Sequence, residues 1–86
     1  MWFLYIIYSD KWKRSYTGVC LDICKRLEEH NSGNTKSTKP FRPWRLVHKE
    51  KFENKSDDYK REYFLKSSAG NKEKRRIIEK KLNKSK

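Results

Sequence analysis

The hydrophobic positions at the start of the chain predict two paired strands. Residues 3 to 9 join β-branched and aromatic side chains without polar interruption, which is typical of a strand covered on both faces. Residues 9 to 15 form a polar, basic turn, and residues 15 to 19 supply a second short strand. The two segments most simply pair as an antiparallel hairpin with an exposed turn.

A helix is expected to follow the hairpin. Asp22 is a favourable N-cap, apolar side chains recur after it at helical spacing, and residues 31 to 33 end the helix. Arg26 and His30 stand four positions apart, so they lie on the same flank of the apolar stripe. We therefore expect both side chains where this helix meets the sheet.

A loop and a third strand come next. Residues 32 to 43 contain a glycine and two prolines among serine, threonine and asparagine, and a loop of this length in a small domain is usually functional or mobile. Residues 44 to 52 alternate between apolar and charged side chains, which predicts a strand with one face in water. Its apolar face is expected to carry Trp44, Leu46, His48 and Phe52.

The next segment has the pattern of a second helix. Ser56 is a candidate N-cap, and the two aspartates that follow it suit the positive end of a helix dipole. The helix is expected to reach about residue 67, with Tyr59 and Tyr63 on its inner face. Glu62 lies beside this tyrosine pair.

A basic helix is predicted at the end of the chain. Asn71 can cap a helix over residues 71 to 83, whose apolar stripe is narrow and whose sides are almost wholly charged. The pattern thus predicts one α+β domain over residues 1 to 83, in which helices flank a small three-stranded antiparallel sheet. Residues 84 to 86 are expected to form a mobile basic tail.

The net charge of the chain favours a negatively charged binding partner. The formal net charge is +12, and half of this excess falls in residues 71 to 86. Such an excess is the usual footprint of a polyanionic partner, and nucleic acid is the leading candidate. An anionic membrane surface is the alternative, although no apolar run reaches the roughly 18 residues of a membrane span and the only amphipathic basic helix is the last one.

The first eight residues and the two cysteines indicate a cytoplasmic protein. The apolar start of the chain lacks the basic segment and the cleavage site of a signal peptide. Cys20 and Cys24 stand four positions apart, which matches neither a redox pair nor half of a zinc site. Both are expected to be buried, reduced thiols.

The order of these elements, together with two short motifs, resembles the GIY-YIG nuclease superfamily. The motifs are Phe3-Leu4-Tyr5 in the first strand and Tyr16-Thr17-Gly18 in the second. In that superfamily an arginine follows the second tyrosine ten positions later, often with a histidine one turn beyond, as Arg26 and His30 do here. A carboxylate on the next long helix completes the site, and Glu62 matches it.

The likeness extends over about residues 2 to 80 and is greatest to small stand-alone members of the superfamily. Phe3 replaces the glycine of the first motif, and Thr17 replaces the isoleucine of the second. Val19 stands where members similar to the excinuclease subunit often have a lysine, so a lysine-assisted tyrosine is not available at that position.

The resemblance implies a DNA endonuclease that hydrolyses phosphodiester bonds with one Mg²⁺ or Mn²⁺ ion. Glu62 would bind the metal, since Mg²⁺ typically takes one or two carboxylates and keeps several waters. Arg26 would hold a phosphate oxygen in the transition state. Tyr16, with Tyr5 as its partner, would orient or deprotonate the attacking water, and His30 is the alternative acceptor of that proton.

Basic residues outside this set are expected to hold the nucleic acid. Lys36, Lys39 and Arg42 in the long loop would contact phosphates, and Trp12 in the exposed turn could stack on a base. A role in DNA repair or recombination, a protein partner that supplies specificity, and a monomer or weak dimer fit this picture. The competing hypothesis is a binding module of the same fold whose catalysis is weak or lost.

Overall fold

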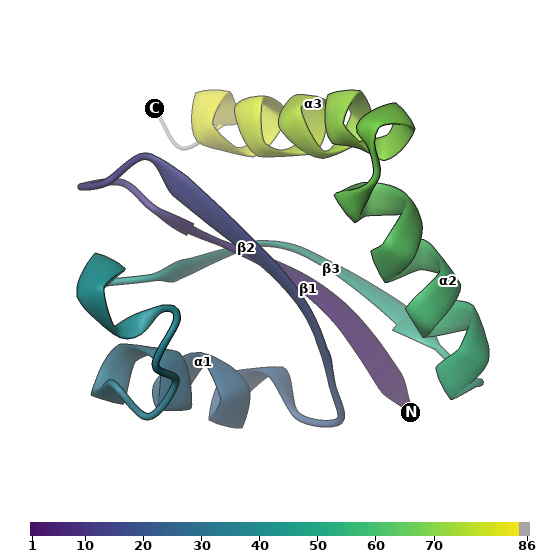
Figure 1. Cartoon of the computed structure of the whole chain (residues 1–86), viewed down its shortest axis with the longest axis horizontal. Coiled ribbons are helices and arrows are strands. Elements are labelled where there is room, and N and C mark those ends of the chain that lie inside the picture. Colours follow the sequence, from purple (N-terminus) through teal and green to yellow (C-terminus); the bar gives the residue numbers. More distant parts are fainter. Residues whose placement is uncertain (85–86) are drawn as a thin grey trace.

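Three strands form one antiparallel sheet in the order β2-β1-β3, and helices lie on both of its faces (Figure 1). The structure, a computed structural model, describes residues 1 to 84. The elements in chain order are β1 (Trp2–Ser9), β2 (Arg14–Cys20), α1 (Ile23–Ser32), a short 3₁₀ helix η1 (Lys39–Phe41), β3 (Arg45–Phe52), α2 (Lys55–Lys66) and α3 (Ser68–Lys84). The predicted α+β class, the antiparallel hairpin and the order of strands and helices are confirmed.

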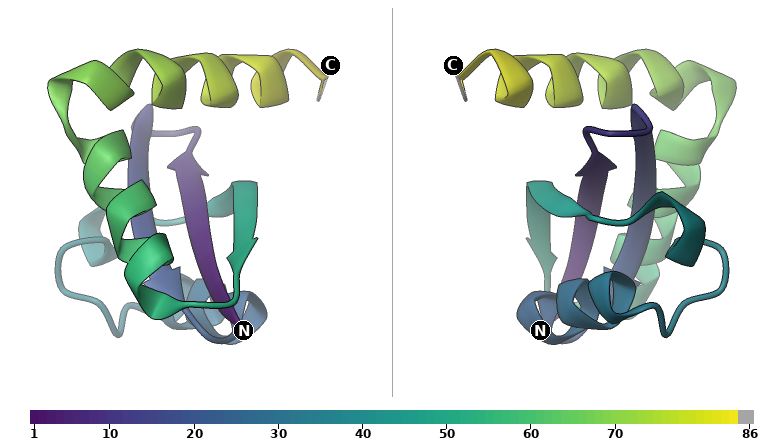
Figure 2. Two further views of the ribbon diagram at one scale, coloured as in Figure 1. Left: turned by 90° about the vertical axis from the view of Figure 1, so that its right-hand side faces the viewer. Right: turned by 90° about the vertical axis from the view of Figure 1, so that its left-hand side faces the viewer.

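The central strand β1 divides the interior into two hydrophobic clusters because alternate side chains point to opposite faces of the sheet. Leu4 and Ile6 pack with residues of α2 and α3, whereas Tyr5 and Ile7 pack with residues of α1 and η1. Figures 1 and 2 show α1 on one side of the sheet and α3 running across the strands on the other side. The fold therefore has two small cores instead of one.

The prediction that Trp44 and Phe52 share one apolar face of the third strand is wrong, because they lie on opposite faces of the sheet. The register of β3 against β1 shifts by one residue between Ile6 and Ile7, because a β-bulge lies near Val47. A bulge inserts one unpaired residue and so reverses the alternation of side chains beyond it. Trp44 consequently packs on the α1 side, and Phe52 packs on the α2 side.

The predicted inner face of α2 is also wrong. Tyr59 and Tyr63 are exposed, and the fully buried residues of this helix are Asp58 and Leu65. These two stand seven positions apart and therefore lie on the same face, two turns from one another. The spacing of apolar side chains gave the wrong inner face because charged side chains occupy the buried stripe of α2. Cys24 is likewise exposed, although Cys20 is buried as expected.

The last helix begins earlier than predicted. α3 starts at Ser68, directly after Ser67, whose hydroxyl oxygen accepts a hydrogen bond of 3.3 Å from the Gly70 amide. Ser67 thus serves as the N-cap in place of Asn71. A Cβ atom at Gly70 would overlap the Phe64 carbonyl oxygen, so glycine permits this close approach of the two helices. Lys84 is still helical, and the rest of the predicted mobile tail lies outside the described residues.

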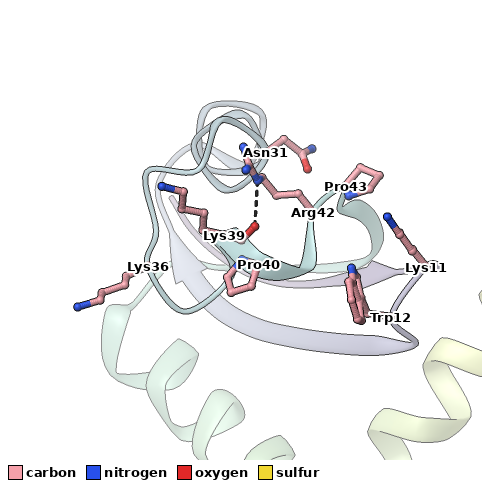
Figure 3. A pocket seen from close by; sticks show the side chains of 8 residues that line it. All are labelled: Lys11, Trp12, Asn31, Lys36, Lys39, Pro40, Arg42 and Pro43. Carbon is pink, nitrogen blue, oxygen red and sulfur yellow. Dashed lines mark hydrogen bonds between the residues drawn. The ribbon is translucent and has the colours of Figure 1, made fainter.

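The loop before β3 is anchored against α1. The Asn31 side chain accepts a hydrogen bond of 2.6 Å from the Trp44 amide and donates one of 3.0 Å to the Trp44 carbonyl oxygen. The Trp44 indole in turn donates to the Thr38 carbonyl oxygen at 2.9 Å. Within the loop, Arg42 donates from Nε to the Lys39 carbonyl oxygen at 2.9 Å (Figure 3). These contacts give the loop one defined path.

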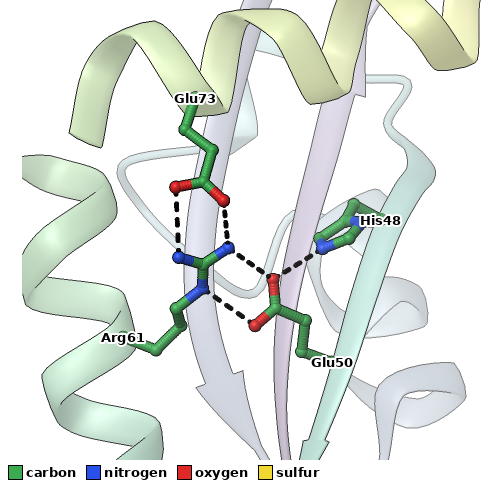
Figure 4. Close-up of polar contacts among 4 residues, drawn as sticks. All are labelled: His48, Glu50, Arg61 and Glu73. Carbon is green, nitrogen blue, oxygen red and sulfur yellow. Dashed lines mark hydrogen bonds and ion pairs between the residues drawn. The ribbon is translucent and has the colours of Figure 1, made fainter.

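Arg61 ties α2 to both β3 and α3 through two carboxylates (Figure 4). Its guanidinium donates to the two oxygens of Glu50 at 2.9 and 3.1 Å and to those of Glu73 at 3.2 and 2.7 Å. His48 lies 2.7 Å from the same Glu50 carboxylate. Burial alone would raise the pKa of Glu50, but the hydrogen bonds from Arg61 and His48 outweigh it and hold that pKa below its ordinary value.

Asp58 is a buried carboxyl group inside this half of the fold. Its side chain has no exposed surface, and neither oxygen has a hydrogen-bond partner among the described residues. Burial, with smaller contributions from Glu62 and Glu50, raises the pKa of Asp58 to about 6. A buried carboxyl group without a partner destabilises the fold whenever it is ionised.

Replacing Arg61 with methionine is expected to lower the free energy of unfolding by about 1–3 kcal/mol, because the partly buried Glu50 carboxylate loses its main partner. In the wild type the contribution of Glu50 is present above its ordinary pKa of 4.5 and is lost as the pH falls through its lowered pKa. Urea titrations from pH 7 to pH 3 should show this acid loss in the wild type and a much smaller one in Arg61→Met.

The matched control is Arg45→Met, which removes an exposed two-point ion pair with Asp10. An exposed pair contributes at most about 1 kcal/mol. Equal destabilisation by the two substitutions would contradict a special role for the Arg61 network.

Replacing Asp58 with asparagine is expected to stabilise the fold at pH 7 by about 1–3 kcal/mol, because the variant has no buried charge. The folded-state pKa of about 6 exceeds the ordinary value of 3.8, so wild-type stability falls as the pH rises between these values. The advantage of Asp58→Asn should therefore vanish near pH 4 and be complete above pH 6, as measured by urea titration. A less stable variant at pH 7 would show that the charged form has a partner in solution.

Candidate active site

The β1–β2 hairpin brings Tyr5 and Tyr16 together on the α1 face of the sheet. Their ring centroids are 6.3 Å apart. Tyr5 lies directly opposite Gly18 in the register, and a Cβ atom at Gly18 would overlap the Tyr5 hydroxyl and ring. Only glycine therefore lets the Tyr5 ring lie across β2. This is the physical reason for the glycine that follows Tyr16 and Thr17.

His30 completes a chain of hydrogen bonds from Tyr5 into the interior. It lies in the last turn of α1 and is 1% exposed. Its Nε2 is 2.9 Å from the Tyr5 hydroxyl, and its Nδ1 is 2.7 Å from the Thr38 hydroxyl. The Thr38 hydroxyl donates its only proton to the Thr35 carbonyl oxygen at 3.3 Å. A Thr38 hydroxyl that donates there accepts from Nδ1, and in this tautomer Nε2 accepts the Tyr5 proton.

The protonation states of this chain follow from its burial. Burial is the largest cause that lowers the pKa of His30 below its ordinary value, and the Arg26 charge adds to it. Burial also raises the pKa of Tyr5 well above 10, and Tyr16 and Glu62 raise it further, against the opposing effect of Arg26. Near neutral pH, His30 is therefore a neutral base and Tyr5 a hydroxyl donor.

Tyr16 is the more accessible of the two tyrosines. Its side chain is partly exposed, and its ring centroid lies 5.0 Å from that of His30. Tyr5 lies beneath it, buried and hydrogen-bonded. The structure thus brings three of the five predicted catalytic residues, Tyr5, Tyr16 and His30, into direct contact.

Arg26 and Glu62 lie at the edge of this group, one on α1 and the other on α2. Both influence the Tyr5 hydroxyl electrostatically, with opposite signs. Arg26 lies 3.7 Å from Glu29, and Glu62 accepts a hydrogen bond of 3.3 Å from Lys66. Each pair lies within one helix and includes a side chain well exposed to water, Arg26 in one and Lys66 in the other, and such pairs contribute only about 0.3–0.5 kcal/mol. Either side chain can therefore change partner at little cost.

The residues present fit a lightly coordinated divalent metal. The described residues contain no group of three or more histidine, cysteine, aspartate or glutamate side chains that could hold a metal ion. Glu62 is 17% exposed at its side chain, and the buried Asp58 carboxyl lies one turn before it on α2. One or two carboxylates with the remaining positions filled by water is the ligand set that Mg²⁺ commonly takes.

The four residues predicted to bind nucleic acid gather around one basic hollow of about 660 Å³ (Figure 3). Its lining is Lys11, Trp12, Asn31, Lys36, Lys39, Pro40, Arg42 and Pro43. Trp12 is 49% exposed and meets the ring of Phe41 edge-on, with centroids 5.9 Å apart. The hairpin turn and the long loop thus form one cationic surface with an aromatic side chain.

Sequence reasoning missed Thr38 and gave Asp58 only a structural role at the start of the helix. Thr38 forms a hydrogen bond with Nδ1 of His30 from within the loop, and no sequence pattern connects it to His30, eight residues earlier. Asp58 looked like part of the first helical turn, and only the packing of α2 shows that it is buried. The four-residue interval between Asp58 and Glu62 was the available signal, since it places both on one helix face.

Three comparisons with known proteins identify related chains. The family model "GIY-YIG catalytic domain" matches residues 1–76. UPF0213 proteins of Staphylococcus aureus and Staphylococcus saprophyticus are each 45% identical to this chain over 65 residues, which are 74% of this chain and 79% of the relative. The solution NMR structure of a UPF0213 protein from Bacillus halodurans has 29% identity and a TM-score of 0.54, and the match covers 90% of this chain and 83% of that one.

The described part of the chain has no helix of the length and apolar character that a membrane span requires. The expected likeness to small single-domain members of the GIY-YIG superfamily is confirmed by the family model, by the UPF0213 relatives and by the solved neighbour. The chain therefore belongs to the GIY-YIG catalytic domain family.

Proposed function

We propose that this protein is a DNA endonuclease that hydrolyses phosphodiester bonds with a single Mg²⁺ or Mn²⁺ ion. The observation that carries the proposal is the contact of Tyr5 with His30 and Tyr16, close enough to Arg26 and Glu62 for both charges to act on the Tyr5 hydroxyl. These are the kinds of groups that phosphodiester hydrolysis requires. Membership of a nuclease family supports the same reaction class.

Glu62 is the proposed metal ligand, with the Asp58 carboxyl one turn away as a second oxygen donor when it is ionised. A divalent ion there would neutralise negative charge as it builds on the phosphoryl group. Arg26 would hold a non-bridging phosphate oxygen with its planar set of donors. Glu62 and Arg26 would exchange Lys66 and Glu29 for these partners, and both existing ion pairs are weak.

Tyr16, Tyr5 and His30 are proposed to orient and deprotonate the attacking water. The accessible Tyr16 hydroxyl would orient the water, and Tyr5 would accept a proton from it while passing its own proton to Nε2 of His30. The Nδ1 proton stays on its bond to Thr38, so the imidazolium that forms keeps a hydrogen-bond partner. This relay replaces prior ionisation of Tyr5, whose raised pKa keeps it in the hydroxyl form near neutral pH.

The basic hollow is proposed to bind the phosphates of DNA beside this site. Lys36, Lys39 and Arg42 would neutralise phosphates, and Trp12 would stack on a base. Such contacts give affinity without sequence discrimination and make binding strongly salt-dependent. DNA repair or recombination is the setting that we propose for the activity, with a protein partner as the source of further specificity.

The first test is cleavage of branched, nicked, single-stranded and duplex DNA with Mg²⁺ or Mn²⁺. Glu62→Gln and Arg26→Gln should each lower kcat by about 10²–10³, since each removes a group that stabilises charge in the transition state. Removal of the metal by a chelator should abolish cleavage. Binding of DNA, measured by anisotropy, should change little in either variant.

The matched control is Glu53→Gln, which neutralises an exposed carboxylate between β3 and α2, outside the candidate site, and should leave kcat unchanged. Cleavage that is absent in the wild type, with binding indifferent to Glu62→Gln, would favour the competing hypothesis of a binding module of the same fold. Equal cleavage by the wild type and both site variants would assign the activity to other residues.

The second test concerns the proton relay. Tyr5→Phe keeps the ring over Gly18 but removes the hydroxyl, so kcat should fall by about 10²–10⁴ with DNA binding retained. The rate should also fall at acid pH as His30 becomes protonated, with a midpoint below 6.5 because the pKa of His30 is lowered by burial. Both effects are measured from the pH dependence of kcat.

Tyr8→Phe is the control for this substitution, because Tyr8 lies on the same strand but packs with the cluster on the other face of the sheet. Its kcat and pH profile should match those of the wild type. A Tyr5→Phe variant with a normal rate and an unchanged acid limb would rule out the relay.

A further inference from the structure

α2 turns its aromatic side chains away from the core. Tyr63 is 80% exposed and Tyr59 is 51% exposed, although both are large side chains that are usually well buried. They stand one helical turn apart and therefore share one face. The core on this side of the sheet is completed by Leu65 and by residues of α3 and the sheet. The two tyrosines are thus available for binding.

The tyrosines line a hollow with the proposed metal ligand. This α2 hollow has a volume of about 440 Å³ and is lined by Tyr59, Lys60, Glu62, Tyr63 and Lys66. Its size falls within the range of about 300–1,000 Å³ typical of small-ligand pockets. A further cation, the Lys55 ammonium, lies 5.4 Å from the Tyr59 ring centroid. The hollow therefore combines aromatic walls with a largely cationic rim.

We propose that the α2 hollow holds an unpaired nucleobase next to the phosphate that is cut. The inference rests on the proposed function, because it places that phosphate at Glu62. The nucleotide beside such a phosphate lies within one helical turn of both tyrosine rings. A base stacks on an aromatic ring whatever its identity, and Lys60 and Lys66 can pair with the flanking phosphates.

Charge favours nucleic acid over a second copy of this chain as the occupant. Two molecules that each carry a formal charge of +12 repel one another, and lysines at the rim of the hollow increase this repulsion locally. A nucleic acid strand brings the opposite charge and a planar apolar base. Tyrosine with lysine on one face matches that combination.

Phe64 provides an internal comparison on the same helix. It is also exposed, at 40%, but it is outside the α2 hollow, and the Arg61 guanidinium lies 5.7 Å from its ring centroid. A general attraction of aromatic side chains for DNA would involve Phe64 as well. The proposed subsite involves only Tyr59 and Tyr63.

The test measures binding of a single-stranded DNA oligonucleotide with one fluorescent adenine analogue, in the presence of a chelator so that no cleavage occurs. Tyr59→Leu and Tyr63→Leu should each weaken binding by about 5- to 100-fold and relieve quenching of the analogue. Tyr63→Phe should restore both, because the ring is kept. Phe64→Leu should behave as the wild type.

An oligonucleotide of the same length with abasic residues separates base stacking from charge. It should bind the wild type and the tyrosine variants equally, and the salt dependence of binding should be the same for all of them, since no phosphate contact changes. A loss of affinity for the abasic strand in Tyr63→Leu would overturn the proposal. So would unchanged binding of the normal strand, or a shift of the sedimentation coefficient that assigns this face to a second copy.

The same experiment distinguishes the two proposals. If the wild type quenches the analogue through Tyr63 but cleaves no DNA with metal, the base subsite stands and the endonuclease function fails. If the wild type cleaves DNA in a Glu62-dependent manner while Tyr63→Leu binds and cleaves normally, the function stands and the subsite is refuted.

Discussion

The close crossing of the Tyr5 ring over Gly18 is the constraint on which the candidate site depends. A Cβ atom at that position would occupy the space of the Tyr5 hydroxyl, so the ring can lie across β2 only above a residue without a side chain. From this position the hydroxyl reaches His30, and His30 reaches Thr38 in the loop before β3. The absence of a Cβ atom at Gly18 thus allows the hydrogen bonds that join the hairpin, α1 and the loop.

The sequence was sufficient for the parts of the site that depend on local geometry. The alternation of the hairpin and the i, i+4 spacing of Arg26 and His30 follow from strand and helix periodicity, and the structure has both elements as predicted. The placement of α2 was not accessible in this way. Its inner stripe carries Asp58, which is buried without a hydrogen-bond partner among the described residues, and Arg61, which pairs with carboxylates of β3 and α3. Hydrophobicity alone therefore assigned the tyrosines to the core.

The bulge in β3 shows a second limit of pattern analysis. The segment alternates regularly enough to predict one strand, but one extra residue near Val47 exchanges the faces on either side of it. This exchange lets Trp44 pack beside α1, where its indole holds the Thr38 carbonyl, while Glu50 on the other face meets Arg61. The same strand thereby supports the histidine on one side and α2 on the other.

The two faces of the sheet consequently carry different groups, and α2 carries residues that act on both. The α3 side holds the ion-pair network of Arg61, and the α1 side holds the tyrosines and His30. Glu62 follows Arg61 directly along α2, yet its charge acts on Tyr5 across β2. The position of Glu62 relative to the tyrosines is therefore set by how Arg61 anchors the helix. A change in that network would alter the geometry of the candidate site without changing any residue of the site itself, because one rigid helix carries both side chains.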